Sequence, residues 1–187
     1  TLGSMPIIKH DYTFRKTLEI KLRLELEYLC KQGILDADEA TFKQLHQAIL
    51  EDVYVQVVAT TTHSREVLKR LSERYPMVLV SNFYGNMEVV LKEFGLNHLF
   101  SDVVESAIVG IRKPDPRIYK LGVERLRLLP EEVIVVGDSF YKDIEPARKI
   151  GCKTVWFKGE GWTTQQYDER IPDGIITDIA QLSSIVL

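Results

Sequence analysis

The chain has 187 residues, of which 45% are hydrophobic and 27% are charged, with a formal net charge of −3. This length can bury one sizeable core, or a core with a small insertion. The weak negative charge gives no electrostatic reason to expect a nucleic acid or a membrane surface as partner, and no run of about twenty apolar residues could span a bilayer.

Two cysteines, Cys30 and Cys152, lie far apart in the sequence. Neither has a second Cys or a His at the spacing of zinc ligands, so a zinc site is not expected. Isolated cysteines of this kind are typical of buried thiols in a reducing compartment, and we therefore predict a cytoplasmic protein.

The first sixty residues are predicted to be helical. Apolar residues recur every three or four positions between residues 13 and 31, with charged residues on the other faces. Gly33 is a typical helix stop, and Asp36 or Asp38 can cap a second helix that runs to about residue 58. Because no strand pattern occurs here, we interpret residues 1–60 as a separate helical module.

The pattern changes near residue 60, where Thr60 to Ser64 form a polar stretch that we interpret as a joint between helices, with Thr62 or Ser64 as the next helix cap. Beyond it, strand and helix patterns alternate. Strands are predicted at 77–80, 103–105, 133–136, 154–157 and 174–176, and helices at 86–93, 116–127, 140–150 and 179–185. This alternation predicts an α/β core over residues 61–187, with a doubly wound parallel sheet.

The run from Val133 to Val136 ends in Gly137 and Asp138, and Asp143 follows five residues after Asp138. Four apolar residues closed by glycine predict a parallel strand buried on both faces. Ligands bind at the carboxyl edge of such sheets, and two carboxylates that converge there suit Mg²⁺. The alternative is a surface turn with two solvated acids.

Another apolar strand ends in Ser81 and Asn82. The hydroxyl and amide groups can donate hydrogen bonds to an anionic oxygen. The alternative is that one of them caps the helix that follows.

Lys113 lies in a loop that two prolines, Pro114 and Pro116, hold rigid. Proline disfavours helical geometry at the residue before it, so Lys113 is predicted to be extended. A lysine fixed in this way can place its ammonium over a phosphate. The alternative is an ordinary solvated lysine.

Together, Ser81, Lys113, Asp138 and Asp143 follow one another in an order that resembles the haloacid dehalogenase-like hydrolase superfamily, over nearly all of residues 60–160. The resemblance implies a Rossmann-like core in which the Ser81 hydroxyl binds the transferred phosphoryl group and the Lys113 ammonium stabilises it. It also implies that Asp138 and Asp143 are Mg²⁺ ligands. The helical module would be the cap over the active site.

Within this family, the resemblance implies phosphoryl transfer rather than carbon–halogen cleavage, because members that cleave carbon–halogen bonds lack the acid pair seen at Asp138 and Asp143. The run from Lys113 to Tyr119 is similar to phosphatase-type members. The expected substrate is a small phosphorylated metabolite, and the expected intermediate is an aspartyl phosphate.

The family's first motif, an Asp-x-Asp on an N-terminal strand that supplies the nucleophile, has no counterpart in the sequence. Asp36-x-Asp38 lies between predicted helices and is interpreted as a helix cap. We expect the nucleophile upstream of Thr1, and this chain alone to be inactive. Two alternatives stay open: phosphoryl transfer within a sugar phosphate, as in related phosphoglucomutase-like enzymes, and a non-catalytic module that binds metal or anion.

Overall fold

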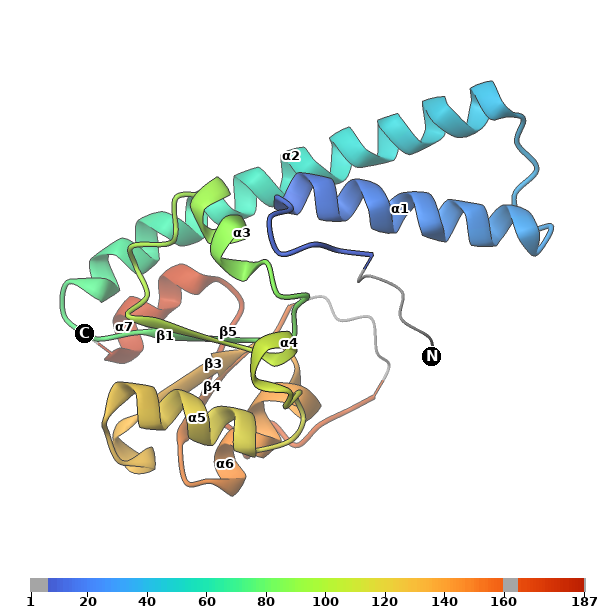
Figure 1. Ribbon diagram of the computed structural model, residues 1–187. Coiled ribbons are helices and arrows are strands. Elements are labelled where there is room, and N and C mark those ends of the chain that lie inside the picture. The colour runs from blue at the N-terminus through green and yellow to red at the C-terminus, as the bar shows by residue number, and fades with distance from the viewer. Residues whose placement is uncertain (1–6, 160–164, 187) are drawn as a thin grey trace. The chain divides into compact units, whose positions relative to one another are not determined.

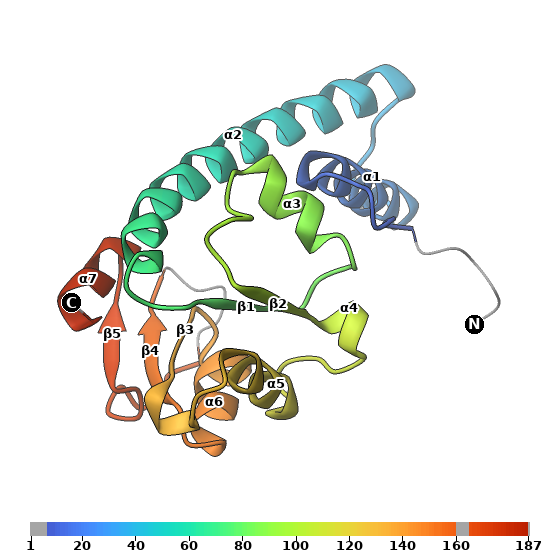
Figure 2. The same cartoon turned by 60° about the vertical axis from the view of Figure 1, so that its left-hand side comes forward.

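The computed structural model describes residues 7–159 and 165–186 and divides into two compact units (Figures 1 and 2). The first unit runs to Arg65 and adds Asn86–Asn97, and the second consists of Glu66–Gly85 and the chain from His98 onward. The first unit therefore extends beyond the predicted module of residues 1–60 and includes a segment taken from the middle of the α/β core.

The described part of the first unit is helical. It contains α1 (Phe14–Lys31), most of α2 (Glu39–Ser72) and α3 (Met87–Glu93). The Thr13 side chain caps α1 by accepting a hydrogen bond from the Lys16 amide, and Asp38 accepts one from the Thr41 amide at 2.7 Å, just before α2. The interpretation of Asp38 as a helix cap is thus confirmed.

The predicted joint at residues 60–64 is wrong, because α2 continues through it to Ser72. The Thr61 hydroxyl donates to the Val57 carbonyl at 2.7 Å, four residues earlier in the same helix. A threonine that bonds back in this way satisfies its hydroxyl without leaving helical geometry. The prediction of a helix end at these residues rested on their polar composition alone, which does not indicate whether the helix continues.

Asn86 ties α3 to the start of α1 within the first unit. Its side chain is 1% exposed, and its amide nitrogen donates to the Tyr12 carbonyl at 2.7 Å and to the Thr17 hydroxyl at 2.9 Å. The rings of Phe14 and Phe94 pack edge to face beside this link. A buried amide with specific partners fixes the position of α3 more narrowly than apolar contacts alone.

In the described residues, the second unit contains five parallel strands, which confirms the α/β class. In one sheet, β1 (Val78–Ser81) pairs with β2 (Asp102–Glu105), and in the other β4 (Lys153–Phe157) lies between β3 (Ile134–Gly137) and β5 (Gly174–Ile176). The α-helices that follow β2 in the described chain are α4 (Ser106–Val109), α5 (Arg117–Leu126), α6 (Glu145–Lys149) and α7 (Leu182–Val186). A short π-helix, Phe140–Ile144, precedes α6 where one continuous helix was predicted.

Helices cover these strands on two faces, as expected for a doubly wound arrangement. On one face, Ile118 and Val123 of α5 and Ala147 of α6 pack with Val104 of β2. On the other, Leu71 at the end of α2 and Leu182 of α7 pack with Val155 and Ile176.

The strand β3 differs from the prediction. Ile134 is 38% exposed and Val136 is 42% exposed, although the apolar run predicted burial on both faces. Among the described residues, β3 has a strand neighbour only on its β4 side, and β1 only on its β2 side. The expected single sheet is therefore two sheets, and the edges of β1 and β3 are open.

Among the helices that the structure describes, none is long and apolar enough to cross a membrane. Both cysteines are free thiols. Cys152 is buried at 4% exposure and Cys30 is partly exposed.

Candidate active site

Three of the residues singled out from the sequence contact one another in series: Asn82 contacts Lys113, and Lys113 contacts Asp143. The Lys113 amide donates to Asn82 Oδ1 at 2.9 Å, and Asn82 Nδ2 donates to the Lys113 carbonyl at 3.1 Å. The Lys113 ammonium in turn lies 2.8 Å from Asp143 Oδ1. The segments that follow β1 and β3 are therefore joined through the loop that carries Lys113.

This arrangement excludes two of the alternatives considered from the sequence. The helix α3 begins at Met87 with Asn86 at its cap position, so neither Ser81 nor Asn82 caps it. The Lys113 side chain is 17% exposed and bonded to a carboxylate that is 4% exposed. It is therefore not an ordinary solvated lysine.

Asp143 accepts hydrogen bonds from three directions. Besides Lys113, the Tyr119 hydroxyl donates to Oδ1 at 2.5 Å and the Ser139 amide donates to Oδ2 at 2.9 Å. Gly137 allows this approach, because a Cβ at that position would lie 2.6 Å from Asp143 Cγ. A buried carboxylate with a cation and two further donors is well stabilised.

Tyr119, on α5, was not singled out from the sequence. It is 3% exposed, and burial together with the negative charges of Asp143 and Asp138 raises the pKa of its phenol. The protonated hydroxyl therefore persists as a donor to Asp143. Its position in an amphipathic helix made it resemble an ordinary core aromatic, and only its proximity to Lys113 in the sequence could have drawn attention to it.

Asp138 is exposed at the end of β3, where its carbonyl accepts a hydrogen bond from Trp156 Nε1 at 3.0 Å. Within residues 7–159 and 165–186, its carboxylate makes no hydrogen bond. Asp138 lines the same cavity as Lys113 and Tyr119, both of which contact Asp143, so the two predicted carboxylates share one neighbourhood.

These two carboxylates fit the donor chemistry of Mg²⁺, which proteins bind through one or two carboxylates while several waters remain on the ion. Asp138 offers free oxygens, whereas those of Asp143 are already shared with protein donors. In the described part of the chain, no group of three or more His, Cys, Asp or Glu side chains comes together. A fuller set of protein ligands would need a further acid.

Glu105 is a second polar residue that the sequence patterns missed. It lies opposite Ser81 in the β1–β2 register, is 5% exposed, and accepts a hydrogen bond from the Gly85 amide. Ser106 exchanges hydrogen bonds with the backbone of Phe83 in the same loop. Together they fix the loop after Ser81, and a carboxylate at the end of a strand could have marked this position.

The model of the haloacid dehalogenase-like hydrolase family matches residues 6–151 of the chain. The chain belongs to this family. A glyceraldehyde 3-phosphate phosphatase of Pyrococcus furiosus is 36% identical over 92 residues, which are 49% of this chain and 38% of that protein. The 5-amino-6-(5-phospho-D-ribitylamino)uracil phosphatase YigB of Escherichia coli is 32% identical over 131 residues, 69% of this chain and 52% of that protein. The chain thus spans about half the length of these relatives, or less.

Relatives at lower identity include (S)-2-haloacid dehalogenases of Pseudomonas. Among solved structures, the HAD-hydrolase YfnB of Bacillus subtilis bound to magnesium has a TM-score of 0.61 at 20% identity, over 92% of this chain and 82% of that one. At this identity the likeness establishes the fold alone. Family and fold agree with the resemblance inferred from the motifs.

Proposed function

We propose that this chain is part of a Mg²⁺-dependent phosphatase that acts on small phosphorylated metabolites in the cytoplasm. The observation that carries the proposal is the ion pair between Lys113 and Asp143, beside Asp138 and next to the end of β1. The phosphatases among the relatives support this reaction class over dehalogenation.

In the proposed reaction, Ser81 donates its hydroxyl hydrogen bond to the phosphoryl group, and the Lys113 ammonium offsets charge on the same oxygens. Asn82 is a positioning residue, because both polar atoms of its amide are bonded to the Lys113 backbone. Asp143 orients the ammonium from the other side. Loose phosphoryl transition states are stabilised mainly by such fixed charges.

The nucleophile is proposed to be an Asp on a segment that precedes Thr1. A carboxylate oxygen attacks phosphorus and the P–O bond to the alcohol breaks, while the second Asp of the same Asp-x-Asp segment gives its proton to the leaving alcohol oxygen and takes one back from the attacking water. Water then attacks the acyl phosphate, which releases inorganic phosphate and restores the carboxylate. Asp138 and Asp143 would hold Mg²⁺, which when bound supplies charge neutralisation at the phosphoryl oxygens. The helical module at residues 1–60 is proposed to act as the cap.

The test uses the protein with its preceding segment on a panel of phosphate esters, with and without Mg²⁺. Lys113→Gln is expected to lower kcat by about 10²- to 10³-fold, because a fixed charge at the transferring group is lost. The matched control is Lys142→Gln, an exposed lysine in the turn after β3. If no ester releases phosphate in a metal-dependent way, the phosphatase proposal is wrong.

The assay also separates the two alternatives. An isomerised phosphosugar in place of free phosphate would identify a mutase. Binding of Mg²⁺ or phosphate without turnover of any ester would identify a non-catalytic module.

A further inference from the structure

The indole of Trp156, in β4, contacts the turn that joins the two predicted metal ligands. Its Nε1 donates a hydrogen bond to the Asp138 carbonyl at 3.0 Å, and Trp156 is 9% exposed. The sequence patterns did not single out this residue, and the proposed reaction does not use it. A predicted metal ligand is thus bonded, through its own backbone, to a buried side chain of the neighbouring strand.

The register of the sheet explains why the indole reaches this turn. Trp156 pairs with Gly137 across the parallel strands β3 and β4, and residues that pair in this way project to the same face of the sheet. On that face Gly137 has no side chain, and the Asp143 side chain lies so close that a Cβ would collide with it. The indole and the turn from Asp138 to Asp143 therefore share one face of the sheet.

An aromatic cluster holds the indole against the turn. Its ring meets the Phe140 ring edge to face, with centroids 5.2 Å apart, and the Tyr167 ring stacks on Phe140 at 4.4 Å. Ile144, which is fully buried, belongs to the same cluster. Phe140 and Ile144 are the first and last residues of the short π-helix that contains Asp143. Because such helices are rare and occur mostly as single turns, the packing of both ends in one cluster with Trp156 supports this turn from outside.

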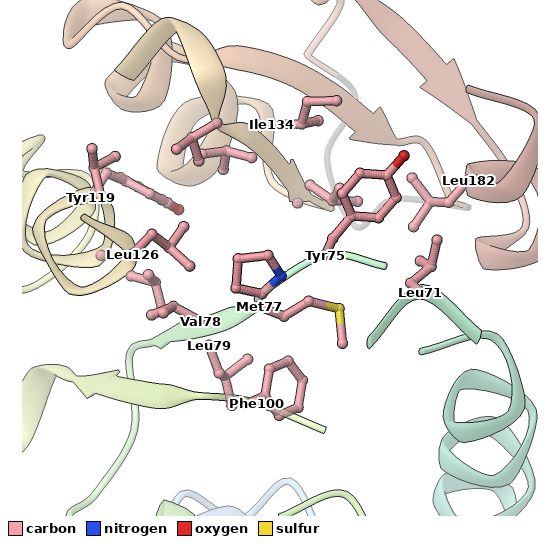
Figure 3. Close-up of a pocket in the computed structure, with 18 of the residues that line it drawn as sticks. Leu71, Tyr75, Met77, Val78, Leu79, Phe100, Tyr119, Leu126, Ile134 and Leu182 are labelled. Carbon is pink, nitrogen blue, oxygen red and sulfur yellow. The ribbon is translucent and has the colours of Figure 1, made fainter. Parts of the chain in front are cut away.

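Trp156 does not share the cavity of the predicted site. In the described part of the chain, Asp138 and Lys113 line a cavity of about 820 Å³, and Trp156 does not. Figure 3 shows this cavity between β1, with Leu79, and β3, with Ile134. Trp156 can therefore act on a group bound there only through Asp138.

We propose that Trp156 is a positioning residue for Asp138, the predicted Mg²⁺ ligand at the end of β3. A peptide group is planar, so a donor held on the Asp138 carbonyl fixes the peptide that leads into Ser139. The bond thereby restricts the direction in which the Asp138 side chain leaves the backbone. This side chain is exposed and makes no hydrogen bond within residues 7–159 and 165–186, so its direction depends on the backbone.

The role toward Mg²⁺ rests on the proposed function, whereas the position of the turn rests on the contacts alone. Loss of a partner that orients a metal ligand typically costs about 10- to 100-fold in metal affinity or activity. The alternative is that the indole bonds this carbonyl only because a buried N–H needs an acceptor. Positioning predicts weaker Mg²⁺ binding when the donor is removed, and the alternative predicts a loss of stability alone.

The test measures Mg²⁺ affinity by titration calorimetry in the protein with its preceding segment. Trp156→Phe, which keeps an aromatic ring and removes the donor, is expected to raise the Kd of Mg²⁺ about tenfold or more. The matched control is Val155→Ala, because Val155 is 2% exposed and its side chain packs with Leu71 and Ile176 on the opposite face of β4. This control should lower stability and leave the Kd unchanged. An equal Kd in the two variants would overturn the proposal.

An isosteric replacement separates the donor from the size of the ring. The sequence has two tryptophans, Trp156 and Trp162, and Trp162 lies outside the described residues. In a Trp162→Phe chain, benzothienylalanine is incorporated in place of tryptophan at position 156, which replaces the N–H by sulfur and keeps the bicyclic ring. The Kd should rise as in Trp156→Phe. An unchanged Kd would show that ring packing alone acts, which would also overturn the proposal.

Amide hydrogen exchange of the metal-free protein reports on the turn independently of Mg²⁺. The Ser139 amide donates to Asp143 Oδ2 at 2.9 Å, and the Asp143 amide donates to the Ser139 carbonyl at 2.7 Å. Both amides are expected to exchange at least about tenfold faster in Trp156→Phe than in Val155→Ala, because a loosened turn opens more often. If the unsubstituted protein binds no Mg²⁺, the proposed function fails, and this exchange then decides the role of Trp156: faster exchange upholds its hold on the turn, and equal exchange overturns it.

Discussion

Lys113, Tyr119 and Asp143 depend on one another at the level of single residues. Each is largely buried, and each satisfies a polar group of the next through the 2.8 Å ion pair and the 2.5 Å hydrogen bond. Removing one member leaves the others buried with fewer partners, which costs more than the contact itself contributes.

Tyr119→Phe removes the phenol hydroxyl and keeps the ring. The free energy of unfolding should fall by about 1.5–3 kcal/mol, the range for hydrogen bonds to charged groups. Urea unfolding measures the change. Tyr141→Phe is the control, because Tyr141 is 53% exposed and its loss of a hydroxyl should cost less than about 0.5 kcal/mol. Equal changes in the two variants would contradict the role given to Tyr119.

Gly137→Ala places a methyl group against the Asp143 side chain, 2.7 Å from Oδ2. Because Asp143 is held by three donors, it cannot move without breaking them, and the expected loss of stability is about 1–3 kcal/mol. Gly159→Ala is the matched control, since a Cβ there meets nothing within 4 Å. Thermal unfolding of both variants tests the close approach, and a harmless Gly137→Ala would disprove it.

Burial raises the pKa of the Cys152 thiol to about 11, above its ordinary value of 9.0. The unfolded chain loses this proton first as pH rises, so the stabilisation is complete below pH 9 and is lost as pH approaches 11. Stability should fall over this window by about 2–3 kcal/mol from this group. Cys152→Ala should reduce the slope of stability against pH, and Cys30→Ala should not. Equal slopes for both variants would contradict the shift.

At the scale of elements, the strand and helix patterns predicted the secondary structure well wherever periodicity was strong. All five strands occur within a residue or two of their predicted positions, and Gly33 has the left-handed backbone expected of a helix stop. The predicted end of the second helix was wrong because a local hydrogen bond keeps the helix continuous there. Thr61 keeps α2 intact by bonding back to Val57, and composition does not report such a bond.

The junction of α1 and α3 depends on Asn86. Asn86→Ala should lower the free energy of unfolding by about 1–3 kcal/mol, because the Tyr12 carbonyl and the Thr17 hydroxyl lose a buried donor. Asn97→Ala, at an exposed position of the same unit, is the control and should have little effect. Circular dichroism in urea measures both, and a neutral Asn86→Ala would show that apolar packing alone holds α3.

At the scale of the whole molecule, metal binding is expected to increase the free energy of unfolding. A ligand that binds only the folded state stabilises it by about 2.7 kcal/mol at a hundred times its Kd. Mg²⁺ is therefore expected to raise the thermal midpoint, and Asp138→Asn to remove most of that rise. Asp36→Asn, at an exposed acid in the first unit, should keep it. A rise that survives Asp138→Asn would place the metal elsewhere.

The pattern of residues along the chain was enough to predict the class of fold, the parallel direction of the strands and the positions of Ser81 and Asp138 at the ends of β1 and β3, because these depend on local periodicity and on where apolar runs stop. The contacts between side chains of distant segments, and the exposure of each strand, became visible only in the tertiary structure. Packing between segments distant in the chain brings the Tyr119 hydroxyl to Asp143 and the Glu105 carboxylate to the Gly85 amide in the loop after Ser81. The tertiary structure also left Ile134 and Val136 open, because burial of a strand depends on which neighbours pair with it and not on its own composition.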